Sequence, residues 1–333
     1  MRDRPEDVDE GELSRVLDKW GIGAASLAYA PVGFGDHHWI AADDRGRKWF
    51  VTVADLELKN GQGSQAALRG LRKAMDTAAA LRDQEKLDFV VAPLRAADGE
   101  TVHRLGPRYA LSVFPFVEGV AGDFDQPLTP QERGAVLDLL AELHRQTPPA
   151  STPVLHAELS MRGLLEKALE GVISWAGGPF AEPARTLLSG RAPGLRQRLE
   201  EFDRLVKELK ESHRAPVVTH GEPHPGNLLR LEDRYLMVDW DTVGLASPER
   251  DLWSVVREPE DLARYAKAGG RMPDASALTL YRLRWDLEEV SIYVDWFRAP
   301  HDRSLDMEQA WDGLVGAVER LTDKAPEKRQ TLR

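Results

Sequence analysis

The sequence predicts an α+β fold in which a small strand-rich part precedes a larger, mainly helical part. Three observations predict it. Residues 26–56 alternate apolar and polar side chains around two turns, residues 64–83 have helical spacing, and the periodicity is mainly helical from residue 127 onward. Of the 333 residues, 42% are hydrophobic and 30% are charged, which is typical of a globular protein of one large or two modest domains.

Five strands and one helix are expected between residues 25 and 117, after a short amphipathic helix at residues 8–20. The stretch 26–56 contains a strand, a glycine turn in GFGDHH, a second strand, a hairpin turn in DDRG and a third strand. The elements that follow are a helix at 64–83 and strands at 89–94 and 109–119. The predicted order is therefore β-β-β-α-β-β.

The helical part begins with a capping box, in which Thr129 is the N-cap, Pro130 the first helical residue and Glu132 the third. Short strands are expected within residues 216–240. Apolar spacing predicts helices at 128–146, 161–176, 194–214, 277–299 and 307–324.

Composition excludes several classes of protein. The net charge of −11 argues against a nucleic-acid partner, because such proteins normally carry a basic excess. The absence of cysteine rules out disulfides, thiolate metal sites and thiol catalysis. No apolar run approaches the roughly 18–20 residues that span a bilayer, and the N-terminus lacks the apolar core of a secretory signal. We therefore expect a cytoplasmic protein with no membrane partner.

The stretch THGEPHPGNLL, residues 219–229, carries most of the chemistry. Glu222 follows the end of an apolar strand, where a loop can present its carboxylate to a substrate. A hairpin turning at residues 232–234 would bring Asp239 back beside Asn227. One carboxylate and one amide oxygen suit Mg²⁺ that is completed by water and phosphate oxygens. A separate carboxylate, Glu222, can orient and deprotonate a hydroxyl, and these are the parts of a kinase catalytic loop.

This pattern resembles the aminoglycoside phosphotransferase family, within the wider set that includes choline kinase and protein kinases. The family motif is His-Gly-Asp, four residues, Asn and a hydrophobic-Asp strand. The corresponding residues here are His220-Gly221-Glu222, Asn227 and Val238-Asp239-Trp240-Asp241. PERDLW (248–253) and LAELH (140–144) also resemble the family. The resemblance covers nearly the whole chain, is strongest over 216–254, and looks nearest to the spectinomycin phosphotransferase branch.

The resemblance implies a bilobal, protein-kinase-like fold with a five-stranded antiparallel N-lobe (1–113), a hinge (114–119) and a helical C-lobe (120–333). It implies ATP or GTP as the co-substrate and Mg²⁺ held by Asn227 and Asp239.

Structural roles are implied for four further residues. His220 and Asp251 are expected to brace the catalytic loop, whereas His224 and Trp240 are expected to pack rather than to take part in the chemistry.

The sequence departs from the family at the catalytic aspartate, which is Glu222 here. The extra methylene moves the carboxylate by roughly 1–1.5 Å. Pro223 and Pro225 stiffen the loop, so its backbone can be held in a shape that suits the longer side chain. Glu222 therefore remains the expected base.

The second departure concerns the nucleotide phosphates, because the family's lysine on the third strand falls on Thr52 here. We therefore expect a relocated cation, either Arg69 or Arg72 from the following helix, or His37 or His38 from the glycine turn. The glycine turn would cover the phosphates and the hinge would line the adenine slot; the residues expected there are Gly33, Gly35, Phe114 and Phe116.

An acidic and aromatic surface is expected to bind the acceptor. Trp285, Glu288 and Tyr293 recur at helical spacing near the C-terminus, and Asp241 and Glu249 add carboxylates near the catalytic loop. Such a surface suits a cationic, sugar-like ligand through ion pairs and ring stacking. The alternative is a helix whose aromatic residues lie in the core and whose acids are solvated.

The expected activity is Mg²⁺-dependent transfer of the γ-phosphate of ATP (or GTP) to a hydroxyl of a small cationic molecule. An aminoglycoside- or aminocyclitol-type antibiotic is the favoured acceptor, and the enzyme is expected to be a monomer or a homodimer. One alternative is a small-metabolite kinase of choline or aminosugar type. Another is a pseudokinase that binds nucleotide or drug without turnover, which the missing lysine and Glu222 motivate.

Overall fold

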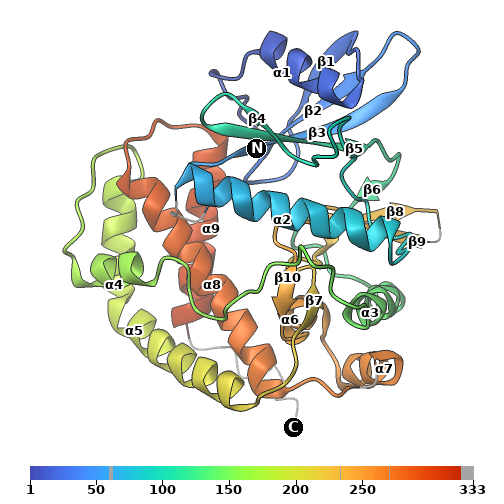
Figure 1. Ribbon diagram of the computed structural model, residues 1–333. Coiled ribbons are helices and arrows are strands. Elements are labelled where there is room, and N and C mark those ends of the chain that lie inside the picture. Colours follow the sequence, from blue (N-terminus) through green and yellow to red (C-terminus); the bar gives the residue numbers. More distant parts are fainter. Residues whose placement is uncertain (60–62, 233, 270, 324–333) are drawn as a thin grey trace. The chain divides into compact units, whose positions relative to one another are not determined.

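The computed structural model describes residues 1–59, 63–232, 234–269 and 271–323, and Figure 1 labels its elements. The chain packs into two compact units, one made of residues 1–155 with 216–272, and the other of residues 156–215 with the chain from residue 273 onward. The predicted lobe and hinge boundaries do not coincide with these units, because the segment after residue 216 packs with the strand-rich part. Those boundaries remain predictions.

Five antiparallel strands form the sheet of the first unit, as predicted. In spatial order they are β1 (Ser26–Ala30), β2 (His37–Ala42), β3 (Lys48–Asp55), β5 (Tyr109–Pro115) and β4 (His103–Leu105). The register places Trp39 opposite Val51, and Val51 opposite Val113. Because side chains alternate along a strand, these three lie on one face and their sequence neighbours point to the other.

One strand was predicted in the wrong place. Residues 89–94 form no strand: Val90 makes an isolated bridge to Met237, and the Leu94 N–H donates to the carbonyl of Val113 at 2.7 Å. The apolar run in this segment reflects burial rather than strand pairing. The strand that the prediction missed, β4, has three residues, which is too short for an alternating pattern to be recognised.

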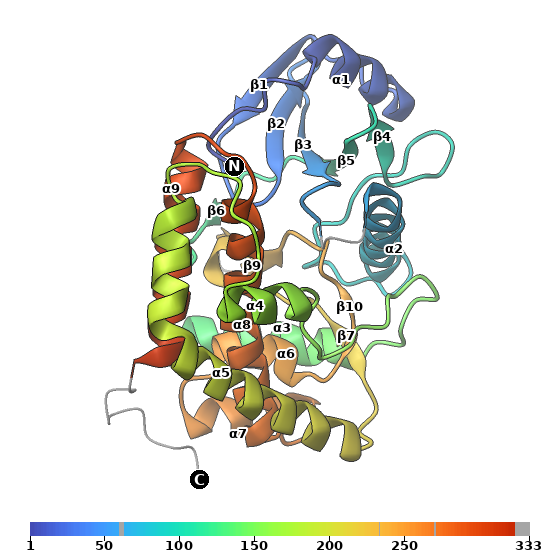
Figure 2. The same ribbon diagram turned by 90° about the vertical axis from the view of Figure 1, so that its left-hand side faces the viewer.

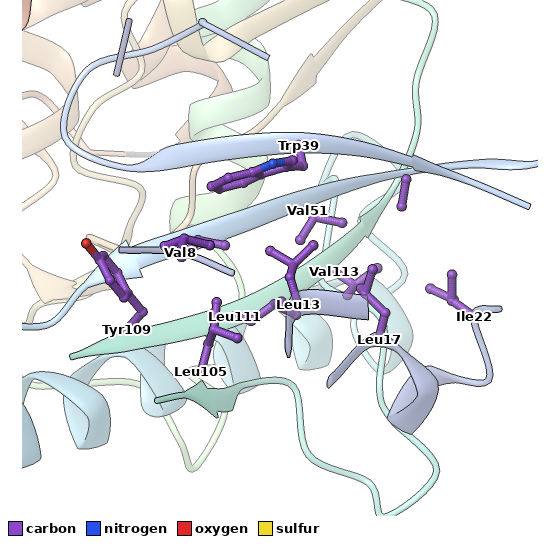
Figure 3. Close-up of a cluster of buried hydrophobic side chains, with 12 residues drawn as sticks. Val8, Leu13, Leu17, Ile22, Trp39, Val51, Leu105, Tyr109, Leu111 and Val113 are labelled. Carbon is purple, nitrogen blue, oxygen red and sulfur yellow. The ribbon is translucent and has the colours of Figure 1, made fainter. Parts of the chain in front are cut away.

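One face of the sheet carries the hydrophobic core shown in Figure 3. Helix α1 (Glu10–Leu17), which continues into the 3₁₀ turn η1 (Asp18–Trp20), packs here, and its Leu13 and Leu17 are fully buried. The sheet contributes Trp39, Ala41, Val51, Val53, Leu111 and Val113. Burying a Leu or Val side chain contributes roughly 1.5–3 kcal/mol. This face therefore holds α1 to the sheet.

The rest of the first unit is helical, with two small sheets. Helix α2 (Ser64–Asp83) follows β3, and α3 (Pro130–His144) begins with the predicted capping box, in which Thr129 and Glu132 exchange hydrogen bonds of 2.8 and 3.3 Å. The other elements are β6 (Val120–Ala121), β7 (Val217–Thr219), η2 (Pro225–Asn227), β8 (Leu228–Leu231), β9 (Arg234–Met237), β10 (Gly244–Ala246), α6 (Glu249–Val255) and α7 (Pro259–Gly269). Strands β6, β8 and β9 form one small sheet, and β7 and β10 form the other.

The second unit is built from long helices, and Figure 2 shows α5, α8 and α9 packed side by side. Its elements are α4 (Arg162–Glu170), α5 (Ala181–Glu211), α8 (Ala275–Arg298) and α9 (Leu305–Thr322). Helix α5 starts earlier than the predicted residue 194 and runs through Pro193, although an interior proline costs about 3 kcal/mol. The predicted end of the last helix, residue 324, lies outside the described residues. No helix in the described part of the chain is long and apolar enough to cross a bilayer.

Candidate active site

The predicted catalytic loop, residues 220–227, connects β7 to β8. Gly221 has a φ of 107°, a conformation that favours glycine, and a Cβ there would lie 2.2 Å from the guanidinium of Arg250. That guanidinium donates to Thr219 Oγ1 at 2.8 Å and to the carbonyl of Thr242 at 2.9 Å. The motif glycine therefore leaves room for an arginine that ties β7, before the loop, to the segment that leads into β10.

Asp251, in α6, holds the first residues of the loop. Its fully buried carboxylate accepts hydrogen bonds from the backbone N–H groups of His220 at 2.8 Å and Gly221 at 2.6 Å. The same carboxylate lies 2.9 Å from Nε2 of His144, the last residue of α3. Burial disfavours ionisation of Asp251, but hydrogen bonding and charge from His144 outweigh it and lower the pKa of this carboxyl. These contacts are those that a structural brace requires.

His220 links the loop to the end of β9. Its Nε2 donates to the carbonyl of Val238 at 2.9 Å, and its Nδ1 accepts the N–H of Glu222 at 3.2 Å. The ring is fully buried, and burial lowers its pKa, so the neutral imidazole that these two bonds need is the favoured form. Both ring nitrogens are engaged in these structural bonds.

Strands β8 and β9 pair as an antiparallel hairpin, as predicted. The Val238 N–H donates to the carbonyl of Asn227 at 3.0 Å, which places Asp239 next to Asn227 along the hairpin. The predicted turn includes residue 233, which lies outside the described residues.

The Asn227 side chain is oriented by two contacts. Its Nδ2 donates to the carbonyl of Glu222 at 3.1 Å and lies 3.2 Å from Nε2 of His224. Burial lowers the pKa of His224 to about 4, so the ring is neutral, and in the tautomer that carries its proton on Nδ1 the Nε2 atom can accept this bond. Because the amide nitrogen faces these two groups, Oδ1 on the other side of the amide is the atom offered to a ligand.

His224 therefore does more than the packing that was predicted for it. Its Nε2 also lies 3.9 Å from Oε2 of Glu222, so the neutral ring sits between the carboxylate of Glu222 and the amide of Asn227. The motif spacing alone did not reveal this contact, because it depends on how the two prolines of the loop turn the chain.

Asp239 has a left-handed backbone with a φ of 63°, which is uncommon outside glycine and which aspartate tolerates better than most residues. Its side chain is accessible to solvent even though many protein atoms surround it. This dense setting, together with Asp241 and Glu222 nearby, raises the pKa of Asp239. Strained backbone at an accessible carboxylate is typical of functional sites.

The donor set at Asn227 and Asp239 fits Mg²⁺. This ion prefers oxygen ligands, keeps several waters, and is usually bound through one or two carboxylates and substrate phosphates. An amide oxygen and one accessible carboxylate match that preference. Within the described ranges, no group of three or more His, Asp and Glu side chains is arranged to hold a metal.

Lys59, which was not among the predicted site residues, lies beside this site. Lys59 Nζ is 2.6 Å from Oδ2 of Asp241 and 3.1 Å from Oδ1 of Asp36. Burial disfavours the charged lysine, but the two aspartates outweigh it and raise the pKa of Lys59. The same ion pair lowers the pKa of Asp241 against the effect of burial. Lys59 is therefore a charged ammonium held between two carboxylates.

The second face of the five-stranded sheet carries several of the residues predicted at the nucleotide. The register places His38 opposite Thr52 and Phe50 opposite Phe114, and all four share this face. Phe116 follows β5, and the ammonium of Lys48 lies 5.3 Å from the centre of its ring.

The loop between β1 and β2 carries Gly33 and Gly35. Their φ angles of 70° and 111° favour glycine. A Cβ at Gly33 would lie 3.3 Å from the ring of His38, so the loop turns closely over the start of β2.

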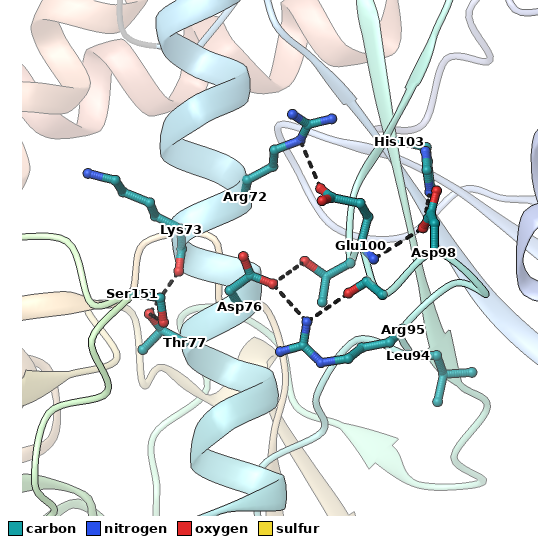
Figure 4. Close-up of polar contacts among 12 residues, drawn as sticks. Arg72, Lys73, Asp76, Thr77, Leu94, Arg95, Asp98, Glu100, His103 and Ser151 are labelled. Atoms are coloured by element: carbon teal, nitrogen blue, oxygen red, sulfur yellow. Dashed lines mark hydrogen bonds and ion pairs between the residues drawn. The ribbon is translucent and has the colours of Figure 1, made fainter.

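Neither arginine proposed as the relocated cation has the position of Lys59. Arg72 extends from α2 towards Glu100, with 3.6 Å between the charged atoms, as Figure 4 shows. Arg69 is exposed on the same helix. The cation beside the carboxylates of Asp36 and Asp241 is therefore Lys59 and neither arginine.

The two histidines proposed for that role lie on opposite faces of the sheet. His38 is neutral, because burial lowers its pKa to about 3, and its Nδ1 lies 3.2 Å from Thr52 Oγ1. His37 is buried on the opposite face of the sheet, where its Nδ1 lies 3.2 Å from the hydroxyl of Tyr29. The alternation of side chains along β2 separates these neighbours in sequence.

Two of the carboxylates predicted at the acceptor have other surroundings. Asp241 is paired with Lys59. Glu249 is fully buried and accepts a hydrogen bond from the hydroxyl of Ser247, so its predicted contact with a substrate is wrong for this structure.

The other three residues predicted at the acceptor belong to the second unit. The Glu288 carboxylate accepts from the N–H and hydroxyl of Ser160. Tyr293 is buried, and a Cβ at Gly313 of α9 would lie 2.6 Å from its hydroxyl. Trp285 is half-buried on α8. Their contact with an acceptor stays a prediction.

A turn after β3 explains why Lys59 was missed. The Asp55 side chain accepts the N–H of Glu57 at 3.0 Å, an Asx-type turn that redirects the chain after the strand. The cation was expected on the third strand, on the following helix or in the glycine turn. An aspartate at the strand end, followed closely by a lysine, was the available signal.

The fold and the site together define a phosphotransferase of the protein-kinase-like fold. The chain has an antiparallel sheet, a mainly helical remainder, and a His-Gly-acid loop joined to an Asn–Asp hairpin. The model of the phosphotransferase enzyme family (APH) matches residues 31–282, so the chain belongs to that family. No curated protein matches the chain in sequence.

Solved structures with the same fold include kinases of several small molecules. Spectinomycin phosphotransferase APH(9)-Ia in complex with ADP and spectinomycin has a TM-score of 0.70 at 15% identity, over 93% of this chain and 96% of that one. An amicoumacin kinase in complex with AMP-PNP and Ca²⁺ has a TM-score of 0.60 at 15% identity, over 96% and 94%. A microcompartment-associated aminopropanol kinase has a TM-score of 0.61 at 17% identity, over 93% and 95%. At these identities the likeness establishes the fold.

Proposed function

We propose that this protein transfers the γ-phosphate of ATP or GTP to a hydroxyl of a small cationic acceptor of aminoglycoside or aminocyclitol type. The observation that carries the proposal is the geometry of the catalytic loop. The Asn227 amide is fixed to the carbonyl of Glu222 at 3.1 Å, and Asp239 lies just after the paired strand β9. Family membership supports the reaction class, and the spectinomycin-bound structure of this fold supports the acceptor class.

Glu222 is the proposed base. Its side chain is 30% exposed, so an acceptor hydroxyl can reach the carboxylate. The hydroxyl oxygen forms a bond to the γ-phosphorus while the bond from that phosphorus to the β–γ bridging oxygen breaks. Glu222 receives the hydroxyl proton, and the nucleoside diphosphate leaves. Asn227 and Asp239 would hold Mg²⁺, which neutralises charge on the phosphate oxygens when bound.

The second face of the sheet, which carries Phe50 and Phe114, is the proposed site of the nucleotide base. Phe50 and Phe114 are paired across β3 and β5 on that face, and they offer apolar rings to a purine. Gly33 and Gly35 precede β2 at the end of the sheet, and the backbone N–H groups of a glycine loop can bind phosphates.

The acceptor class is supported by a loop that packs on the catalytic loop. The Gly122 N–H donates to the carbonyl of Pro225 at 3.0 Å, and the ring of Phe124 lies 4.6 Å from the ring of His224, edge to face. Phe124 is 47% exposed and has an aspartate on each side in the sequence. An accessible ring among carboxylates suits an amine-bearing molecule, through cation–π contact and ion pairs.

Purified protein with Mg²⁺ and either ATP or GTP tests the proposal against a panel of aminoglycosides and aminocyclitols. We expect nucleoside diphosphate release that depends on one class of acceptor, with a mass increase of one phosphate on the product. The Asp239→Ala variant is the matched control, because it removes a proposed metal ligand. A panel that yields no phosphorylated product would remove the antibiotic assignment.

A second candidate is a kinase of small amino alcohols or aminosugars. The aminopropanol kinase among the structures of the same fold favours it, because that acceptor also joins an amine to a hydroxyl. Expression in a sensitive bacterial host separates the candidates. A resistance kinase raises the drug concentration that stops growth, whereas a metabolite kinase leaves that concentration unchanged and phosphorylates amino alcohols in the purified assay.

A further inference from the structure

We infer that Lys59 binds the nucleotide phosphates in this protein, in place of a lysine on the third strand; the inference rests on the proposed function. The position on β3 that faces the nucleotide is Thr52, which carries no charge and whose hydroxyl lies 3.2 Å from His38 Nδ1. Lys59 follows the end of the same strand, and the turn at Asp55 brings it back towards the sheet's edge. A phosphate-binding ammonium is thus supplied from beyond the strand.

Lys59 lies between the two features assigned to the phosphates. On one side its ammonium is 3.1 Å from Asp36, the residue after Gly35 in the glycine loop. On the other side it is 2.6 Å from Asp241, two residues after the candidate metal ligand Asp239. A triphosphate that lies under the glycine loop and reaches a metal at Asp239 has to pass this ammonium.

The charges around Lys59 make a cation necessary there. The carboxylates of Asp36 and Asp241 both contact the ammonium, and Asp239 lies two residues before Asp241. A triphosphate adds further negative charge, so it binds only where cations offset these carboxylates. An ammonium is a strong phosphate ligand, because its hydrogen bonds to phosphate are assisted by charge. Lys59 contributes a cation to that balance.

A purely structural role for Lys59 predicts a different result. If the lysine served only to neutralise Asp36 beside Asp241, removing the Asp36 charge together with the lysine would restore nucleotide binding. If Lys59 contacts phosphate, the same double variant stays defective, because the ammonium that meets the phosphates is missing.

The experiment measures binding of ATP, ADP and adenosine by calorimetry without acceptor, with GTP, GDP and guanosine in parallel. The variants are Lys59→Met, Lys59→Arg, Asp36→Asn and the double variant Lys59→Met with Asp36→Asn. Lys73→Met, at an exposed lysine of α2, is the control. We expect Lys59→Met to weaken triphosphate and diphosphate binding by about tenfold to a hundredfold and to leave nucleoside binding unchanged.

The remaining variants sharpen the expectation. Lys59→Arg keeps part of the affinity, Asp36→Asn binds at least as tightly as the wild type, and the double variant remains weak. Should Lys59→Met fail to fold, the double variant, which also removes a buried charge, carries the same comparison. Wild-type ATP affinity in Lys59→Met, or recovery in the double variant, overturns the inference.

Product formation separates this inference from the proposed function. If the wild type phosphorylates an acceptor and Lys59→Met does so at the same rate and the same nucleotide KM, the inference fails and the function stands. If the wild type binds ATP through Lys59 but phosphorylates no acceptor, the function fails and the inference stands. A wild type that binds neither ATP nor GTP overturns both.

Discussion

The side-chain amide of Asn227 donates a hydrogen bond to the backbone carbonyl of Glu222 across 3.1 Å. The bond closes the catalytic loop on itself, so the spacing between the proposed base and the proposed metal ligand is fixed through the backbone. The carboxylate of Glu222 takes no part in this bond. Its chemistry can therefore be altered by substitution while Asn227 keeps its position.

Substitution of Glu222 should separate its charge from its length. Glu222→Gln keeps the length but cannot accept a proton, so kcat should fall by about a hundredfold to ten-thousandfold. Glu222→Asp keeps the charge but retracts it by one methylene, and kcat should fall by about a hundredfold. Steady-state kinetics and thermal melting check both, and melting should be unchanged. An Asp variant as fast as the wild type would show that the loop is not adapted to glutamate.

Asp239→Asn tests the metal assignment with little change in shape. The side chain is accessible to solvent, so folding should be preserved, and kcat should fall by about a hundredfold to a thousandfold because a ligand to the charge-neutralising metal is weakened. The measurement is the initial rate against Mg²⁺ concentration, which should saturate only at higher Mg²⁺. The exposed Asp302, changed to Asn, is the control. Unchanged turnover in Asp239→Asn would remove the assignment.

The parts of the site that depend on strand pairing were predictable from the sequence, whereas those that depend on a single side chain were not. The hairpin between Asn227 and Asp239 was predictable, because strand length and turn spacing determine which residues meet. The position of Lys59 was not, because it depends on one side chain, Asp55, turning the chain back after a strand. The burial of Glu249 was likewise hidden, since an acidic residue at a helix start is normally exposed.

The same contrast holds for the fold. The five-stranded sheet followed from alternation and turns, yet residues 89–94 were assigned as a strand because a buried apolar run looks the same whether or not it pairs. Helix α5 was predicted to start at residue 194, whereas the helix begins at Ala181 and runs through Pro193.

Asp251→Ala should destabilise the first unit strongly. The substitution leaves the N–H groups of His220 and Gly221, and the ring of His144, without their buried acceptor. The free energy of unfolding should fall by about 3–5 kcal/mol in urea denaturation. The control is Asp138→Ala, which breaks an exposed ion pair with Arg264 and should cost less than about 1 kcal/mol. Equal losses in the two variants would contradict the brace.

Phe124→Ala tests the acceptor site in the first unit. Loss of a ring that contacts a cationic acceptor should raise the acceptor KM by about threefold to thirtyfold and leave the nucleotide KM unchanged. Val120→Ala, at an exposed apolar residue of β6, is the control. A change confined to the nucleotide KM would place Phe124 outside the acceptor site.

His38 should make the stability of the protein depend on pH. Burial lowers the pKa of His38 to about 3, whereas an unfolded histidine titrates near 6.5. The fold favours the neutral ring, so its contribution to stability is complete above about pH 6.5 and is lost as the pH falls from there towards 3. Between about pH 7.5 and 5.5 this single group should cost the wild type about 1.4 kcal/mol of unfolding free energy.

The His38→Gln variant tests this expectation. Its side chain cannot take up the proton but can still hydrogen-bond to Thr52, so over the same interval the variant should lose about 1.4 kcal/mol less stability than the wild type. Urea denaturation of both proteins at the two pH values, without nucleotide, isolates the effect, because the other titrating groups are common to both. Equal pH dependence of the two proteins would mean that His38 is protonated as readily in the folded state as in the unfolded one, and the neutral ring beside Thr52 would have to be abandoned.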